Sequence, residues 1–180
     1  MNKAKEKVLE NERRREIYEF VKENPGLHMR EIQRRLGIPL TSLEYHLNYL
    51  ERKKILVQEE DRRYCRYFVE EHTDDEKRVL SALRQKRLRE IVLLILDGEV
   101  MCFQELSREI EIADSTLSHY LKLLCDNQIV HKERLGAETC YKLVSEDTVL
   151  RSLLCYKSSF VDKLVDKVLE AFIDVEIVKK

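Results

Sequence analysis

The sequence contains no tryptophan, and only four glycines and two prolines occur among its 180 residues. A fold rich in β-sheet needs many tight turns, which glycine and proline normally supply, so their scarcity favours helices. Long apolar runs are also missing, because the longest one, residues 91–96, is far shorter than the roughly 20 residues of a membrane-spanning helix. The first turns of the chain are charged throughout and lack the apolar stretch of a secretion signal. We therefore expect a mainly helical, cytoplasmic protein with no membrane segment.

Five cysteines are present, and successive ones are 37, 23, 15 and 15 positions apart. This spacing fits neither a zinc knuckle nor a disulfide framework, so we expect isolated reduced thiols. One arrangement suggests a sensor. If a hairpin closes around residues 134–137, His131 would lie opposite Cys140, where the two could share a soft metal ion or tune a thiolate. Two ligands do not make a site, so we predict no metal and no cofactor, and any effector is unknown.

Sequence motifs of common enzymes are also absent. The chain has no G-x-x-x-x-G-K phosphate loop, no G-x-S-x-G nucleophile elbow and no H-E-x-x-H zinc pair. Its five histidines are scattered, and each is better explained as a surface or packing residue than as a catalyst. We therefore expect a protein that is not an enzyme.

The chain contains an internal repeat. A shift of 74 positions without a gap aligns residues 13–69 with residues 87–143, and thirteen of the 57 pairs are identical. Most other apolar positions stay apolar, as in the pair Val21 and Ile95. An apolar pattern that survives without an insertion indicates two copies of one small domain.

Within the first copy, the apolar spacing changes in a fixed order. One helical stripe ends at the Asn-Pro-Gly of residues 24–26, a second ends at Gly37, and leucines at positions 43, 47 and 50 mark a third helix. Residues 55–59 and 64–69 are rich in β-branched and aromatic side chains around a polar turn, which is typical of a two-stranded hairpin. Helix, helix, turn, helix and hairpin is the order of a winged helix-turn-helix domain.

The second copy follows the same order, and Asp114 is expected to be the N-cap of its third helix. Between the copies, Thr73 and Glu76 have the spacing of a capping box that opens a linking helix. After the second copy, apolar residues from Glu146 to about Asp174 recur on one broad helical face.

The predicted fold is therefore mainly α with small β-hairpin wings: two tandem winged helix-turn-helix domains followed by a long C-terminal helix. We assign residues 1–72 to the N-terminal winged helix domain. Residues 73–145 form the linker helix and the second winged helix domain, and residues 146–180 form the C-terminal amphipathic helix.

Three motifs in the first copy resemble a known family. Residues 24–26, Arg30-Glu31-Ile32 and the stretch from Leu43 to Glu51 look like archaeal winged-helix transcriptional regulators related to the ArsR and MarR groups. The resemblance covers residues 13–143 and implies a double-stranded DNA-binding regulator, and a sub-group of such proteins carries two of these domains in tandem. The second copy departs from the motif, because it lacks the Pro-Gly turn and has Ser118-His119-Tyr120 at the positions of Glu44-Tyr45-His46.

The third helix of each copy is the expected reader of base edges in the major groove, because its leucines face inward and turn polar residues outward. In the first copy, these are Thr41, Ser42, Glu44, Tyr45, His46 and Asn48. In the second copy, they are Ser115, Thr116, Ser118, His119 and Lys122.

Phosphate contact is expected mainly from the first copy. Residues 13–69 contain 13 Lys or Arg and 9 Asp or Glu, a net charge of +4, whereas residues 87–143 contain 7 and 10, a net charge of −3. Basic residues also cluster on the second helix, after the third helix at residues 52–54, and in the wing. We predict DNA contacts at Arg30, Arg34, Arg62, Arg63 and Arg66.

The C-terminal helix is the expected dimerisation element, since its apolar face is larger than one small winged helix can cover. The predicted contacts are Leu150, Leu153, Leu154, Phe160, Val161, Leu164, Val165, Val168 and Phe172. The alternative is that this helix folds back on its own domains. A second alternative concerns function: tandem winged helices can also dock on other proteins without reading DNA, and the fold alone does not choose between the two.

Overall fold

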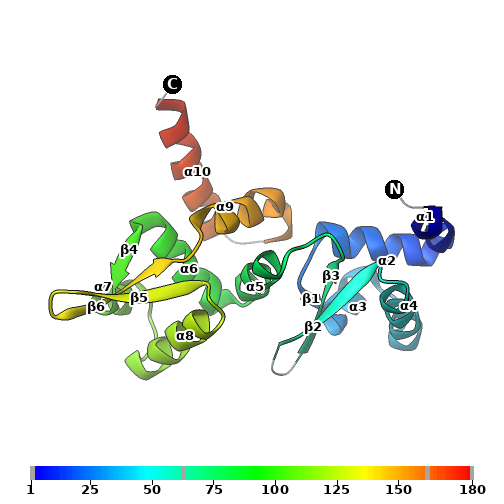
Figure 1. Cartoon of the computed structure of the whole chain (residues 1–180), viewed down its shortest axis with the longest axis horizontal. Helices are drawn as coiled ribbons and strands as arrows, with labels where there is room; N and C mark the ends of the chain where they lie inside the picture. Colours follow the sequence, from blue (N-terminus) through cyan, green and yellow to red (C-terminus); the bar gives the residue numbers. More distant parts are fainter. Residues whose placement is uncertain (1–2, 62–63, 161–162, 179–180) are drawn as a thin grey trace. The chain divides into compact units, whose positions relative to one another are not determined.

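The computed structural model describes residues 3–61, 64–160 and 163–178, and only the backbone of residues 61, 64 and 171–178. The chain forms two compact units, Met1–Lys77 and Arg78–Lys180 (Figure 1). Each unit contains one copy of the repeat, and each is described here by itself.

The first unit is a winged helix-turn-helix domain with an additional N-terminal helix. Its elements are α1 (Lys3–Leu9), α2 (Glu12–Glu23), β1 (Leu27–His28), α3 (Met29–Leu36), α4 (Leu40–Arg52), β2 (Leu56–Asp61) and β3 (Tyr64–Val69). The strands form an antiparallel sheet in the order β1-β3-β2. The expected hairpin is therefore confirmed, and the short strand β1 adds a third member to it.

Local signals define the ends of these helices. Asn11 caps α2, because its side chain accepts a hydrogen bond from the backbone N–H of Arg14 at 3.1 Å. Gly37 ends α3 with φ 66°, a left-handed conformation that glycine adopts without a steric cost. Helix α4 then begins after Pro39, whose ring fixes φ at a value suited to the approach to a helix.

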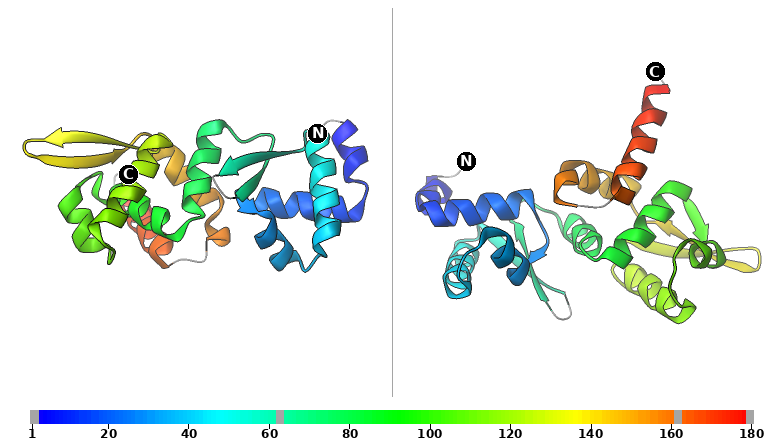
Figure 2. Two further views of the ribbon diagram at one scale, coloured as in Figure 1. Left: turned by 90° about the horizontal axis from the view of Figure 1, so that it is seen from below. Right: turned by 180° about the vertical axis from the view of Figure 1, so that it is seen from behind.

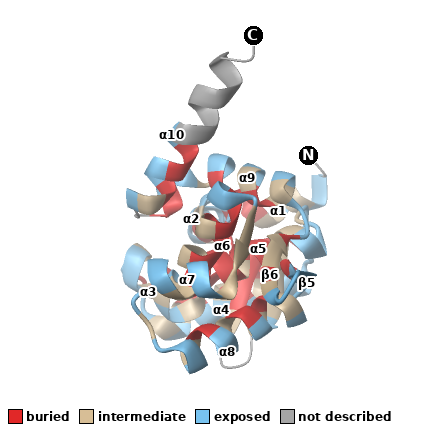
Figure 3. Cartoon of the chain, turned by 90° about the vertical axis from the view of Figure 1, so that its left-hand side faces the viewer, coloured by how far each residue is buried: buried red, intermediate tan, exposed pale blue. Residues whose placement is uncertain are grey.

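The core of the first unit lies between α2, α3, α4 and the sheet. Leu43, Leu47 and Leu50 of α4 are fully buried and pack with Ile17 of α2 and Ile32 of α3. Figure 3 colours the helices by burial, and α3 contains exposed, half-buried and buried residues. Burial of three leucines at i, i+4 and i+7 fixes which face of α4 points to solvent.

The second unit repeats this architecture. Its elements are α6 (Lys86–Gly98), β4 (Val100–Cys102), α7 (Phe103–Glu109), α8 (Asp114–Asp126), β5 (Val130–Leu135) and β6 (Glu138–Leu143), with the sheet order β4-β6-β5. Helix α8 and strands β5 and β6 begin and end 74 residues after α4, β2 and β3. The repeat predicted from the sequence is therefore a structural repeat, and Figure 2 shows its second hairpin, β5–β6, extending beyond α7 and α8.

The capping box at Thr73 is confirmed at the start of α5 (Asp74–Leu83). The backbone N–H of Thr73 donates to Glu76 Oε2 at 2.8 Å, and the backbone N–H of Glu76 donates to Thr73 Oγ1 at 3.3 Å. The expected N-cap of α8 is wrong by one residue: Ala113 is the N-cap and Asp114 is the first helical residue. The Asp114 carboxylate instead accepts a hydrogen bond from Ser107 Oγ at 2.6 Å, which ties α8 to α7.

The C-terminal segment forms two helices where one was expected. Helix α9 (Glu146–Cys155) is followed by a 3-10 turn (Lys157–Ser159) and by α10 (Lys163–Val178). The start of α10 packs on α6, and Val165, Val168 and Leu169 are buried there. Among the helices that the structure describes, none has the length and apolar character needed to cross a membrane.

Candidate nucleic-acid interface

Helix α4 presents one outward stripe. Thr41, Glu44, Tyr45 and Asn48 are exposed and lie at i, i+3, i+4 and i+7, on the face opposite the buried leucines. The Tyr45 side chain is 60% exposed, an unusual state for a large aromatic residue. Ser42 and His46 are half-buried at the edges of this stripe. The structure thus brings the predicted residues of the first copy onto one helix face and its flanks.

Helix α8 presents the same stripe in the second unit. Ser115, Ser118, His119 and Lys122 are exposed at the positions equivalent to those of α4, and Thr116 is half-buried. The only cation on this stripe is Lys122. The side chains of α8 therefore offer base-edge hydrogen bonding with less positive charge than the first unit has around α4.

Glu31 partly neutralises the arginines of α3. The Arg34 guanidinium lies 2.7 Å and the Arg35 guanidinium 2.9 Å from the same Glu31 oxygen. Burial pushes the pKa of Glu31 upward, but the hydrogen bonds from both arginines outweigh it and hold that pKa below its usual range. Arg34 nevertheless keeps 74% of its side chain exposed, so it can still contact a phosphate while paired. Arg30 is exposed, and its guanidinium donates a hydrogen bond to the side-chain oxygen of Gln33 at 3.5 Å.

Three cations cluster at the end of α4, and one of them, Lys53, lies with its Nζ 5.8 Å from the centroid of the Tyr49 ring. Arg52, Lys53 and Lys54 are exposed, and none of the three forms a salt bridge with an acidic side chain described in the structure. Lys54 has φ 54°, and Gln128, its equivalent in the second unit, has φ 55°. The same backbone bend therefore follows each recognition-type helix, but it carries a positive charge only in the first unit.

The prediction for Arg66 is wrong. Its side chain is 5% exposed, and its guanidinium donates a hydrogen bond to the carbonyl oxygen of Gly26 at 2.9 Å. An arginine enclosed in this way holds β3 to the turn before β1 and cannot reach a phosphate. Arg62 and Arg63, the other predicted wing residues, lie outside the residues that the structure describes.

His46 belongs to the α2–α4 contact more than to the outward stripe. Burial lowers its pKa, and the nearby guanidinium groups of Arg14 and Arg13 lower it further, so the imidazole is neutral at pH 7. Arg14 in turn lies over the Tyr49 ring, with its guanidinium carbon 3.7 Å from the ring centroid. His46 therefore adds no positive charge to this surface at neutral pH.

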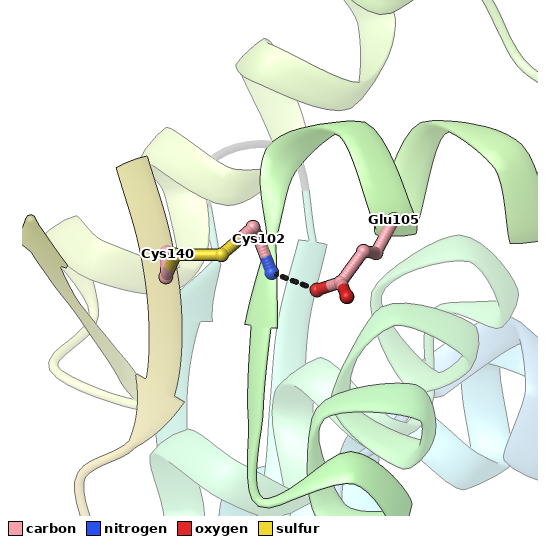
Figure 4. Close-up of a disulfide and its surroundings, with 3 residues drawn as sticks. All are labelled: Cys102, Glu105 and Cys140. Atoms are coloured by element: carbon pink, nitrogen blue, oxygen red, sulfur yellow. Dashed lines mark hydrogen bonds between the residues drawn. A yellow bond between two sulfur atoms is a disulfide. The ribbon is translucent and has the colours of Figure 1, made fainter. Parts of the chain in front are cut away.

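The expectation of reduced thiols is wrong for two cysteines. Cys102 and Cys140 form a disulfide between β4 and β6, as Figure 4 shows. The strand register pairs Cys140 with Glu133 and with Cys102, while His131 is opposite Lys142, so the expected proximity of His131 and Cys140 is also wrong. Glu138 is near the sulfur atoms, and the three potential ligand atoms lie within 4.8 Å of one another. Because the two sulfurs are bonded to each other, they are not available as thiolate ligands in this state.

Sequence reasoning missed this pair because β4 was not predicted. A strand of three residues shows no alternation of apolar and polar side chains, so nothing indicated that Cys102 lies beside β6. A signal did exist in the repeat: the same shift of 74 positions relates Cys102 and Cys140 to His28 and Arg66, which are paired across β1 and β3.

Comparison with known proteins agrees with the geometry of both units. Residues 11–80 match a family model described as an N-terminal HTH domain, and residues 84–132 match the ArsR family of bacterial regulatory proteins. The chain carries two helix-turn-helix domains in tandem. This chain, the tandem HTH protein, is 27% identical over 136 residues to a relative from Methanocaldococcus jannaschii, which is named "Uncharacterized HTH-type transcriptional regulator MJ1398". The match covers 76% of this chain but only 34% of that relative.

Two solved structures of HlyU from Vibrio cholerae also resemble the tandem HTH protein. The structure titled as reduced HlyU has 23% identity and a TM-score of 0.41, and covers 47% of this chain and 87% of its own. The other has 22% identity and a TM-score of 0.43, and covers 50% of this chain and 97% of its own.

Proposed function

We propose that the tandem HTH protein is a DNA-binding transcriptional regulator that reads double-stranded DNA sequence-specifically with α4 of its first unit. The observation that carries this proposal is the outward stripe of α4, which combines hydrogen-bonding side chains with exposed cations at the C-terminal end of the helix. The matched helix-turn-helix families and the regulator from M. jannaschii support the same class of function. No enzymatic role is proposed.

Base reading would come from the stripe itself. The major groove is about 12 Å wide and admits one helix, so a stripe of four side chains can reach successive base pairs. Asn48 can make a bidentate contact with adenine, Glu44 can accept from the cytosine amino group, and Thr41 can bond to either kind of edge. Tyr45, an exposed aromatic side chain, adds apolar contact with thymine methyl groups or with the sugars.

Phosphate contact would come from the cations at the margins of the stripe. Arg52 ends α4 and Lys53 and Lys54 follow it, while Arg30 and Arg34 lie on the exposed side of α3. Neutralised phosphates release their counterions, which supplies most sequence-independent affinity. We propose a supporting role for α8, whose stripe has hydrogen-bonding groups but fewer cations.

We also propose that the protein is a homodimer, although the structure narrows the contacts available for it. Leu153, Phe160, Val165 and Val168 are buried within their own unit, so they cannot face a partner in this conformation. Leu150 and Leu164 are half-buried, and Val161 and Phe172 lie outside the described side chains. Leu154 is the exposed apolar residue of the predicted set, with 53% of its surface accessible.

Salt dependence of DNA affinity tests the proposed interface. Substitution of Arg52 and Lys54 by Gln should lower the magnitude of the slope of log K against log[salt] by about 2, since each lost phosphate contact removes about 0.9. Affinity for duplexes of one sequence would be measured by fluorescence anisotropy at several salt concentrations.

The matched control removes two exposed charges elsewhere. Arg151→Gln with Lys163→Gln changes the net charge equally but alters α9 and α10, so its slope should equal that of the wild type. If both double variants changed the slope equally, the end of α4 would not be the phosphate-binding surface.

A further inference from the structure

The disulfide between Cys102 and Cys140 lies at a junction of the second unit. Cys102 is both the last residue of β4 and the N-cap of α7, and its backbone N–H donates to the Glu105 carboxylate at 2.7 Å (Figure 4). Cys140 is in the middle of β6 and fully buried. The bond therefore links the start of the first helix of the helix-turn-helix to the central strand of the sheet.

In the first unit, non-covalent contacts hold the equivalent positions at the start of α3 and in β3. At the equivalent positions, His28 Nδ1 accepts from the backbone N–H of Glu31 at 3.2 Å and so caps α3. Arg66 donates to the carbonyl oxygen of Gly26. The same fold is thus built once with non-covalent contacts and once with a disulfide, which means that the fold as such does not require the cross-link.

The disulfide closes a loop that contains most of the second winged helix. The two cysteines are 38 residues apart, and the loop that they close contains α7, α8 and β5. This loop includes the whole helix-turn-helix of the second unit. Opening the bond removes the tie at the start of α7, and it restores conformational freedom to the loop in states where the unit is opened or unfolded.

We propose that Cys102 and Cys140 form a reversible dithiol–disulfide couple that exchanges with low-molecular-weight thiols and disulfides and sets the order of α7. Cys102 is the residue that small molecules reach first, because it is half-buried whereas Cys140 is fully buried. Only the effect on DNA binding rests on the function proposed above. The redox chemistry and the ordering of α7 do not depend on it.

The exchange is balanced in atoms and electrons. In oxidation, the Cys102 thiolate attacks one sulfur of a small disulfide and expels one thiolate, which takes up a proton. The Cys140 thiolate then attacks the Cys102 sulfur of this mixed disulfide and expels the second small thiolate. Two protein thiols are thereby oxidised, and one small disulfide is reduced to two thiols. Reduction follows the same steps in reverse.

Equilibration of the full chain with reduced and oxidised glutathione tests reversibility. The oxidised fraction would be measured by rapid alkylation and mass spectrometry over a series of ratios of the two forms. We expect the pair to pass from mostly oxidised to mostly reduced as the ratio of reduced to oxidised glutathione rises through the range found in cells. A pair that stays oxidised in a large excess of reduced glutathione would be a structural cross-link, and the proposal would be overturned.

Hydrogen exchange tests whether the couple acts on α7. Reduction of the wild-type protein should accelerate amide exchange in α7 by about tenfold or more, while α3 of the first unit, which has no such bond, serves as the internal reference. Cys102→Ser should behave as the reduced protein in every buffer, because serine keeps an N-cap acceptor but cannot form the bond. Cys155→Ser removes an unbonded cysteine and should respond like the wild type. Equal exchange of α7 in both redox states would contradict the proposal.

DNA affinity separates this inference from the proposed function. If both hold, the affinity of the wild type differs between redox states and that of Cys102→Ser does not. If the protein binds no DNA in either state, the proposed function fails, while the glutathione and exchange results still decide the redox proposal.

Discussion

Arginines of the first unit illustrate how position determines the role of a charged residue. Arg66 and Arg30 carry the same charge and were both predicted to contact DNA. The structure leaves Arg30 exposed on α3 and buries Arg66, where it donates to the Gly26 carbonyl oxygen. Burial depends on the strand β1 and on the turn before it, so composition and charge clustering alone could not distinguish the two.

Substitution of these two residues should therefore have opposite consequences. Arg66→Ala should lower the free energy of unfolding by about 2 kcal/mol, because it leaves a buried carbonyl without its donor and opens a cavity. Arg30→Ala should leave stability nearly unchanged and reduce the salt slope of DNA binding. Urea denaturation would measure the change in stability, and fluorescence anisotropy would measure the salt dependence of DNA affinity. If Arg66→Ala kept its stability but lowered the slope of log K against log[salt], Arg66 would be a DNA contact after all.

The longer helices and the hairpins of both units could be predicted from the sequence, because their buried apolar residues recur at the spacing of a helix or a strand. Elements too short or too polar to show such local periodicity were missed. Strands β1 and β4 contain two and three residues, too few to show alternation. Helix α1 is charged along most of its length, and Leu9 at its end and the salt bridge between Lys5 and Glu71 hold it to the domain. Such long-range contacts have no counterpart in local sequence.

The pH dependence of stability should reveal the cap of α3. Burial and the neighbouring Arg66 lower the pKa of His28, partly offset by Glu31. Because the folded state has the lower pKa, the unfolded state takes up the proton first, so stability should fall as the pH drops below about 6.5. Protonation also removes the Nδ1 acceptor that caps the helix.

Replacement of His28 by Asn keeps a cap acceptor but removes the titrating group. The decrease in the urea midpoint between pH 7 and pH 5.5 should therefore be smaller in His28→Asn than in the wild type. The remaining decrease is expected from His46, whose pKa is lowered in the same direction. If the variant lost as much stability as the wild type over this range, His28 would not be a source of the pH dependence.

At the scale of the whole molecule, the C-terminal helices serve their own unit more than the sequence suggested. The apolar positions of one expected helix are divided between α9 and α10, and several of them complete the core around α6. The sequence pattern showed an apolar face, but it could not show that the break at Lys157–Ser159 lets the chain fold back.

Assembly should thus depend on the exposed part of this segment. Leu154→Glu should shift a homodimer to monomers by placing a charge in the proposed interface, without loss of thermal stability, since Leu154 is not part of the core. Leu153→Ala, next to it but buried, should instead destabilise the unit by about 2 to 5 kcal/mol. Light scattering and thermal unfolding would report both results, and an unchanged mass for Leu154→Glu would remove this residue from any interface.

Selection of bound duplexes from a random DNA pool tests the central claim most directly. The full chain should enrich one sequence motif, and the Asn48→Ala variant should enrich a motif with relaxed preference at one base pair, since a bidentate contact contributes about 1 to 3 kcal/mol of discrimination. A dimer would also give an inverted repeat with half-sites separated by about 10 bp or a multiple of it. Absence of any enriched sequence, with tight binding to protein partners instead, would contradict the account and favour a docking module.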